Sequence, residues 1–246
     1  MQQLAMICPK CKSEQIDSNT ICDSCGVVFA KYYKYHGEDT QETELIYHDD
    51  YLEFSARQLL FHRDKEVTRA TLIGWALVLA GLIIWSFLFI SSPIESNYAG
   101  ESFMHLINLP FHEAGHIFFR PFGAFMASLG GTLMQILMAV ICLLVFLFKT
   151  RDPFAASVAL WWTGQNFLDI APYINDAQAG QLPLLGGNFG HSSPYGFHDW
   201  EFILNELGLL AHDHLIARIS FVFGSMIMIT ALTWGAMLVG RYYKKT

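Results

Sequence analysis

The chain has few charged residues: Asp, Glu, Lys and Arg together make up 15% of its 246 residues, whereas soluble domains have roughly 25%. The formal net charge is −7, and no segment carries the cluster of basic side chains that neutralises phosphates in nucleic-acid-binding proteins. We therefore expect no nucleic-acid partner. Hydrophobic residues make up 53% of the chain, a composition that favours a membrane protein with the lipid bilayer as its surroundings.

The first 69 residues also lack any apolar run of the length that a secretory signal peptide requires. This part of the chain holds most of the acidic residues and eight of the fifteen Lys and Arg. Neither an internal repeat nor a low-complexity tract is present in the sequence. We expect a polar N-terminal head, without a secretory signal, that precedes an apolar body.

The apolar body contains five segments that we predict to be transmembrane helices, since a helix needs about 20 residues to cross a bilayer. One of them, 102–120, carries ionisable residues, which are costly inside a bilayer and therefore mark a functional site. The other four are apolar over most of their length: 70–91, 124–148, 154–174 and 215–239.

A Gly- and Pro-rich run, 180–200, separates the last two of these segments and is predicted to be a loop. Residues 200–216 then have apolar side chains near helical spacing. This spacing predicts a short amphipathic helix at the membrane interface.

Four of the five cysteines form two C-x2-C pairs, Cys8 with Cys11 and Cys22 with Cys25, with ten residues between the pairs. Each pair presents two thiolates to one ion, so the two pairs supply the four soft ligands of a tetrahedral zinc site. A redox-active dithiol is the alternative, but it more often occurs as a single pair that opens a helix. Reduced, metal-binding cysteines indicate a reducing compartment. The segment resembles the small zinc ribbons of many bacterial proteins, which implies a structural zinc ion and contacts with a protein partner.

The motif "HEAGH" lies in the segment 102–120. Its two histidines, His112 and His116, are four residues apart and therefore share one face of a helix, where they form a clamp of two nitrogens. Glu113 can reach a water on the bound ion without binding the ion itself. A zinc ion with three protein ligands and one open position acidifies its water, and a nearby carboxylate then accepts the proton. The H-E-x-x-H pattern thus predicts a catalytic zinc site.

Over about residues 70–240, the chain resembles the site-2 protease family of membrane-embedded zinc metalloproteases. The resemblance depends on "HEAGH", on the pair Gly130 and Gly131 in the next apolar segment, and on a polar segment that ends near an aspartate. In that family the third zinc ligand is an aspartate of an Asp-Gly pair, downstream of an Asn-x-x-Pro motif.

The corresponding segment here reads "NFLDIAPYINDAQAG". Asn166 matches the asparagine of the motif, Pro172 matches a later proline, and Asp176 stands nearest the aspartate. The segment departs from the family pattern in three ways, because Asp169 replaces the first proline, Ala177 replaces the glycine, and the spacing is longer.

The resemblance implies that Asp176 is the third zinc ligand. Asp169 is the second choice, or else an acceptor that orients a histidine, and Asp199 in the run "FHDW" is a more remote one. The same run, with His198, could instead fold over the site as a lid. Asn166 would donate a hydrogen bond to the substrate carbonyl or to the oxyanion.

The predicted fold is an all-α polytopic membrane protein with about five transmembrane helices and a small N-terminal zinc-ribbon domain. Its parts are a zinc ribbon (1–30), a polar linker or interfacial segment (31–69) and a transmembrane metalloprotease-like domain (70–246). Basic residues are nearly balanced between the two sides of the membrane. The cysteines and the absence of a signal peptide therefore decide the expected location: a multi-pass protein of the bacterial inner membrane, with a cytoplasmic head.

The predicted function is a zinc-dependent intramembrane endopeptidase that cleaves transmembrane or membrane-proximal segments of membrane proteins or peptides. Glu113 would activate the water, and the chain would hold one catalytic and one structural zinc ion. The alternative is a membrane scaffold or regulatory protein that retains a zinc site without proteolysis, because the chain lacks the Asp-Gly pair. An open, water-bearing coordination position would favour the enzyme.

Overall fold

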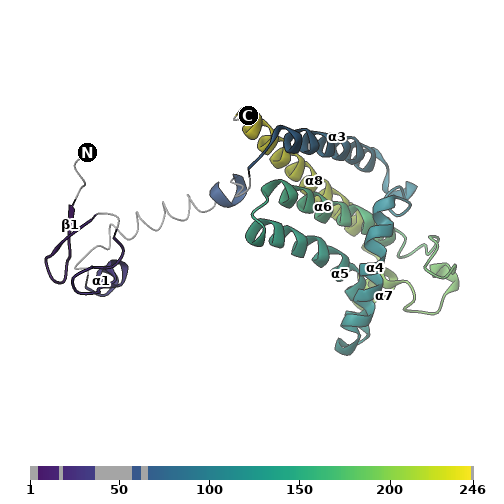
Figure 1. Cartoon of the computed structure of the whole chain (residues 1–246). Coiled ribbons are helices and arrows are strands. Elements are labelled where there is room, and N and C mark those ends of the chain that lie inside the picture. The colour runs from purple at the N-terminus through teal and green to yellow at the C-terminus, as the bar shows by residue number, and fades with distance from the viewer. Residues whose placement is uncertain (1–4, 17–18, 37–56, 62–65, 245–246) are drawn as a thin grey trace. The chain divides into compact units, whose positions relative to one another are not determined.

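The computed structural model describes residues 5–16, 19–36, 57–61 and 66–244. The chain is mostly helical and divides into two compact units, Met1–Ala56 and Arg57–Thr246. The division falls within the predicted linker, most of which lies outside the described residues. Figure 1 shows both units, and each is described by itself below.

The first unit is a small ribbon whose core contains a cluster of cysteines. Strands β1 (Ala5–Ile7) and β2 (Glu14–Ile16) pair in antiparallel register, and helix α1 (Phe29–His36) follows them. Its buried hydrophobic cluster consists of Cys8, Cys22 and Phe29. So small an apolar core supplies little stability, since the smallest domains bury too little surface to be more than marginally stable by themselves.

The second unit is a bundle of helices, in which α6 packs against α5 and α8, and α3 packs against α8. Figure 1 shows α4 near the end of the bundle where α7 also lies. A π-helical turn, Val145–Lys149, continues α5. The helices are α3 (Arg69–Ser91), α4 (Phe103–Phe119), α5 (Ala124–Leu144), α6 (Pro153–Asn175), α7 (Asp199–Glu206) and α8 (Asp213–Tyr243).

Helices occupy all five segments that we predicted to be transmembrane, but only some of these helices are long and apolar enough to cross a membrane. Within the described residues, three stretches are long and apolar enough to cross a membrane: Arg69–Ser91, Ala124–Lys149 and Leu210–Tyr243. Helix α4 is shorter, with 17 residues. Helix α6 has 23 residues and is long enough, but its polar side chains lower its hydropathy.

The polar character of α6 follows from its central position. Sixteen of its 23 residues are buried, so its side chains face neighbouring helices rather than the surroundings. Contact with α8 is close because Gly164 and Gly224 face each other. A Cβ atom on Gly164 would lie 2.7 Å from the carbonyl oxygen of Gly224, and one on Gly224 would lie 2.5 Å from that of Gly164. Small residues of this kind bring helix backbones together in membrane proteins.

Glycines also bring α4 and α5 together. A Cβ atom on Gly115 would overlap the carbonyl oxygen of Gly130, and one on Gly130 would lie 2.7 Å from the carbonyl oxygen of Gly115. This close approach turns the face of α4 that carries His112 and His116 against α5.

The predicted amphipathic helix over 200–216 is wrong in its extent, because α7 ends at Glu206. Gly208 adopts the left-handed conformation, with φ of 68°. The N–H of Gly208 bonds to the carbonyl of Asn205, and the N–H of Leu209 bonds to that of Leu204. These two bonds form a Schellman motif, which ends a helix at a glycine. A short 3-10 turn, Leu210–His212, then leads directly into α8.

Candidate metal centres

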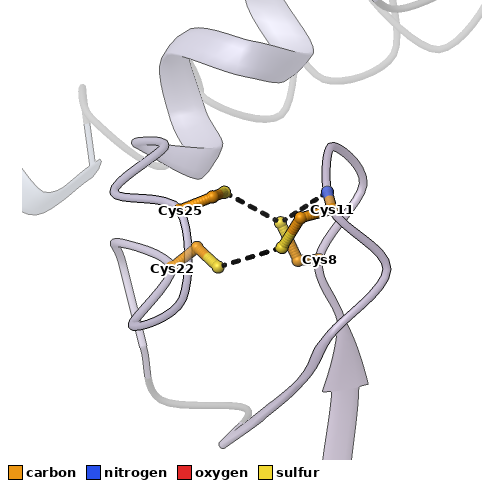
Figure 2. A group of neighbouring side chains, drawn as sticks. All are labelled: Cys8, Cys11, Cys22 and Cys25. Carbon is orange, nitrogen blue, oxygen red and sulfur yellow. Dashed lines mark hydrogen bonds between the residues drawn. The ribbon is translucent and has the colours of Figure 1, made fainter.

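The four cysteines of the first unit lie together and could bind a metal ion, as Figure 2 shows. The Sγ atoms of Cys8 and Cys25 are 3.8 Å apart, and those of Cys11 and Cys22 are 3.6 Å apart. Tetrahedral zinc with Zn–S bonds of about 2.3 Å separates its sulfur ligands by about 3.8 Å. The arrangement therefore suits a single zinc ion, and no disulfide links these cysteines.

Two turns of matching geometry place the cysteines. The N–H of Cys8 bonds to the carbonyl of Ser13, and the N–H of Lys12 bonds back to the carbonyl of Cys8. In the second turn, the N–H of Cys22 bonds to the carbonyl of Val27, and the N–H of Gly26 bonds to the carbonyl of Cys22. The fourth residue after the first cysteine is left-handed in both turns, with φ of 64° at Lys12 and 68° at Gly26. Each turn thereby presents two sulfurs on the same side.

The environment of Cys11 favours its thiolate form. The Oγ atom of Ser13 lies 3.0 Å from the Sγ atom of Cys11. Hydrogen bonds from the side chain and the backbone of Ser13 lower the pKa of Cys11. A thiolate is the form of cysteine that binds metal ions.

In the second unit, α4 carries two histidines whose rings are oriented by α5. The Nδ1 atom of His112 lies 2.9 Å from the Oε1 atom of Gln135, and the Nδ1 atom of His116 lies 2.8 Å from the carbonyl oxygen of Ala127. Both partners are acceptors, so each Nδ1 donates its proton to the bond. In the neutral ring the Nε2 atom then carries a lone pair, as a metal ligand requires.

A carboxylate from α7 lies close to both histidines. The Oδ2 atom of Asp199 is 3.3 Å from the Nε2 atoms of both His112 and His116. Asp199 is the first residue of α7 and has an exposed fraction of 8%. Glu113 lies beside the same group, since one ligand atom each of His112, Glu113 and His116 fall within 4.8 Å of one another.

A glycine of α5 allows the two imidazoles to pack directly against that helix. A Cβ atom on Gly131 would lie 2.6 Å from the Nε2 atom of His112 and 2.7 Å from the Cε1 atom of His116. Two imidazole nitrogens and one carboxylate oxygen form the donor set of a zinc site with three protein ligands. The residues present therefore fit a zinc ion.

The structure places Asp176 beside this site rather than in it. Asp176 is the C-cap residue of α6, and its two carboxylate oxygens accept the N–H groups of Gln181 and Leu182, each at 2.8 Å. Its Oδ2 atom also lies 3.6 Å from the Nε2 atom of His198. Among the contacts of the described residues, none joins Asp176 to His112.

Asp169 belongs to a different buried cluster between α4 and α6, and Asn166 bonds to the backbone of α6 itself. The carboxylate of Asp169 lies 3.1 Å from the Nδ1 atom of His105 and accepts a hydrogen bond of 2.9 Å from the Nδ2 atom of Asn108. Asn166 is fully buried, and its Nδ2 atom donates to the carbonyl of Trp162 at 2.9 Å. Asp169 thus contacts a histidine, but one outside the "HEAGH" motif.

The sequence contains one signal that points to Asp199. No charged residue lies between Asp176 and Asp199, so Asp199 is the first carboxylate after a long uncharged stretch. It also begins a helix, where the partial positive charge of the helix N-terminus favours a carboxylate. Tyr173 has no such signal, although its hydroxyl accepts the N–H of Asp199 at 3.1 Å.

No family model, curated protein or solved structure matches the chain. The chemistry of the two centres is therefore inferred from this chain's own residues. They comprise a cluster of four cysteines in the first unit, and His112, His116 and Asp199 with Glu113 beside them in the second.

Proposed function

We propose that the chain is a zinc-dependent intramembrane endopeptidase, which cleaves transmembrane or membrane-proximal segments of other proteins. One observation carries the proposal: the Oδ2 atom of Asp199 lies 3.3 Å from the Nε2 atoms of both His112 and His116. Two imidazoles and a carboxylate, with a second carboxylate close by, form the set of groups used by zinc peptidases.

In this proposal His112, His116 and Asp199 hold the zinc ion. When bound, zinc would supply an acidified water and would polarise the peptide carbonyl. Glu113 takes the proton of the attacking water and returns it to the leaving amine. Its carboxylate is partly exposed and, within the described part of the chain, makes neither a hydrogen bond nor an ion pair. It is therefore available as a base.

Asn166 has no part in the proposed mechanism. Its side chain has an exposed fraction of 0%, and its amide donor is already bonded to the carbonyl of Trp162. A donor for the oxyanion must be directed at the substrate.

We also propose that α4 and α6 lie within the bilayer, in addition to the three candidate spans. Four apolar side chains of α4 have exposed fractions between 61% and 76%, a surface that lipid would cover: Phe103, Leu106, Ile117 and Phe118. Helix α6 is shielded by its neighbours, so its polar residues need not meet lipid. A helical substrate in this setting must unwind locally before cleavage, because its carbonyls are engaged in backbone hydrogen bonds.

The polar head is proposed to bind a second, structural zinc ion and to contact a protein partner. Its four reduced cysteines are typical of a reducing compartment. We therefore place the head in the cytoplasm and the helical unit in the inner membrane of a bacterium.

The test uses the full-length chain in proteoliposomes with labelled transmembrane peptides as substrates. One set of peptides has Gly, Asn or Pro at the centre, and a matched set has Leu there. We expect the native chain to cleave the first set faster. Glu113→Gln should abolish cleavage and keep the bound zinc, whereas Glu101→Gln, at an exposed position just before α4, should cleave as the native chain does. Full cleavage by Glu113→Gln would overturn the proposal.

A further inference from the structure

The position of Asp199 depends on the residue before it. His198 is the N-cap of α7 and has an exposed fraction of 1%. Its Nδ1 atom accepts the N–H of Glu201 at 3.2 Å. Since Nδ1 is the acceptor, the ring proton is on Nε2. That Nε2 atom faces the Oδ2 atom of Asp176 at 3.6 Å.

Asp176 is the polar group that compensates this buried N–H. Within the described residues the Nε2 atom of His198 makes no hydrogen bond, and the carboxylate of Asp176 is its nearest ionic partner. A buried donor without any polar partner would be costly. The contact is longer than a hydrogen bond, so it acts through charge and dipole attraction.

The position of Asp176 is fixed by backbone contacts with α6 and with the turn that follows it. It caps the C-terminus of α6, and its carboxylate accepts the N–H groups of Gln181 and Leu182 at 2.8 Å each. The carboxylate therefore has a position set by α6 and by the turn that follows it.

Tyr173, in the last turn of α6, makes a second link to the same place. Its ring packs on the ring of His198, with centroids 4.2 Å apart, and its hydroxyl accepts the N–H of Asp199 at 3.1 Å. From the other side, a Cβ atom on Gly190 would lie 2.9 Å from the Cδ2 atom of His198, so the loop closes directly over the ring. The end of α6 thus contacts both His198 and Asp199.

We propose that Asp176 is a positioning residue, which acts through His198 to hold the carboxylate of Asp199 against His112 and His116. This inference rests on the proposed function, because it takes Asp199 as a metal ligand. Groups that orient a metal ligand from outside its coordination sphere typically change metal affinity by about 10- to 100-fold. Asp176 would have an effect of this size without touching the ion.

The experiment measures Co²⁺ binding to the full-length chain in detergent. One equivalent of zinc is added first to fill the four-cysteine site, whose thiolates prefer it, and Co²⁺ is then titrated into the histidine site. Asp176→Asn removes the charge of the carboxylate. His198→Asn keeps a good N-cap for α7 but removes the N–H that faces Asp176. We expect both variants to bind Co²⁺ about 10- to 100-fold more weakly than the native chain, with an unchanged absorption spectrum at saturation.

Two controls separate positioning from other roles. Tyr195→Phe removes hydrogen bonds between the same loop and the far end of α7, to Asn205 and Glu206, and should leave Co²⁺ affinity unchanged. Asp199→Asn removes the proposed ligand and should change both the affinity and the spectrum.

The possible results have different consequences. Native Co²⁺ affinity in Asp176→Asn and His198→Asn would overturn the positioning role alone. An altered spectrum at saturation in Asp176→Asn would make Asp176 a ligand and would also overturn it. A loss of affinity in Tyr195→Phe equal to that of Asp176→Asn would mean that both substitutions act through general loop stability. It would overturn the positioning role. An unchanged spectrum and affinity in Asp199→Asn would instead refute the metal site of the proposed function.

Discussion

The Nε2 atom of His112 and the Oδ2 atom of Asp199 lie 3.3 Å apart, although 87 positions separate the two residues in the chain. The contact joins the middle of α4 to the first residue of α7. It closes a group of two imidazoles and one carboxylate beside Glu113. The proposed peptidase depends on this relationship.

Gly131 lies directly against the two imidazoles of the proposed metal site. In Gly131→Ala the new methyl group would lie 2.6 Å from the Nε2 atom of His112, where it would displace the ring or the ion. We expect this variant to retain one zinc ion per chain, in the cysteine cluster, and to lose peptide cleavage. Elemental analysis of the purified chain measures the zinc content.

The matched control for this change is Gly81→Ala in α3, where a Cβ atom meets nothing within 4 Å. It should retain both zinc ions and cleave at the native rate. A Gly131→Ala variant with two zinc ions and full activity would contradict a metal site at the two imidazoles.

Gly164 sets the distance between α6 and α8. A methyl group on Gly164 would lie 2.7 Å from the carbonyl oxygen of Gly224, which is backbone and cannot move aside as a side chain can. We expect Gly164→Ala to lower the free energy of unfolding by about 1–3 kcal/mol, the usual cost of overpacking. Unfolding in mixed micelles measures it. Gly74→Ala, at an open position of α3, serves as the control, and equal stability of the two variants would contradict the prediction.

Asp169 is predicted to stabilise the bundle rather than to bind the metal. In Asp169→Asn, His105 loses its ionic partner and the hydrogen bond from Asn108 to the carboxylate is weakened. We expect the variant to keep both zinc ions and to lose about 1–3 kcal/mol of stability, as follows when buried polar groups lose partners. Loss of one zinc ion at native stability would instead identify Asp169 as a ligand.

The cysteine cluster is predicted to be independent of the histidine site. Cys11→Ser replaces one thiolate with a hydroxyl, which is a poor zinc ligand, so the first unit should lose its zinc ion and become sensitive to protease. The histidine site should keep its own zinc ion. Cys142→Ser, outside the cluster, is the control and should keep both ions. If Cys11→Ser retained two zinc ions, the four-cysteine site would be refuted.

Local patterns predicted most of the helices and the cysteine cluster. The two cysteines of each C-x2-C turn are three residues apart, and His112 and His116 are four apart on one helix, so spacing alone brings them together. The apolar segments likewise show their extent directly in composition. The end of α7 was missed because a left-handed Gly208 stops the helix while the apolar spacing continues past it.

The place of Asp199, the proposed third zinc ligand, was harder to predict because it depends on a long loop. Residues 177–198 have no helical or alternating pattern, so nothing local indicates where the loop returns. Its path is determined by contacts distant in sequence, such as those of Asp176 with His198 and of Tyr173 with Asp199. Asp176 is nearer in sequence to the histidines, but its carboxylate is turned toward the loop that it organises.

The central claim is that His112, His116 and Asp199 hold one zinc ion. The most direct measurement is an experimental structure of the zinc-loaded full-length chain, with the ion located by its anomalous scattering. We predict an ion within about 2.0–2.2 Å of the Nε2 atoms of both histidines and of a carboxylate oxygen of Asp199. An ion bound to Asp176 or Asp169 in place of Asp199, or no ion between the histidines, would contradict the claim.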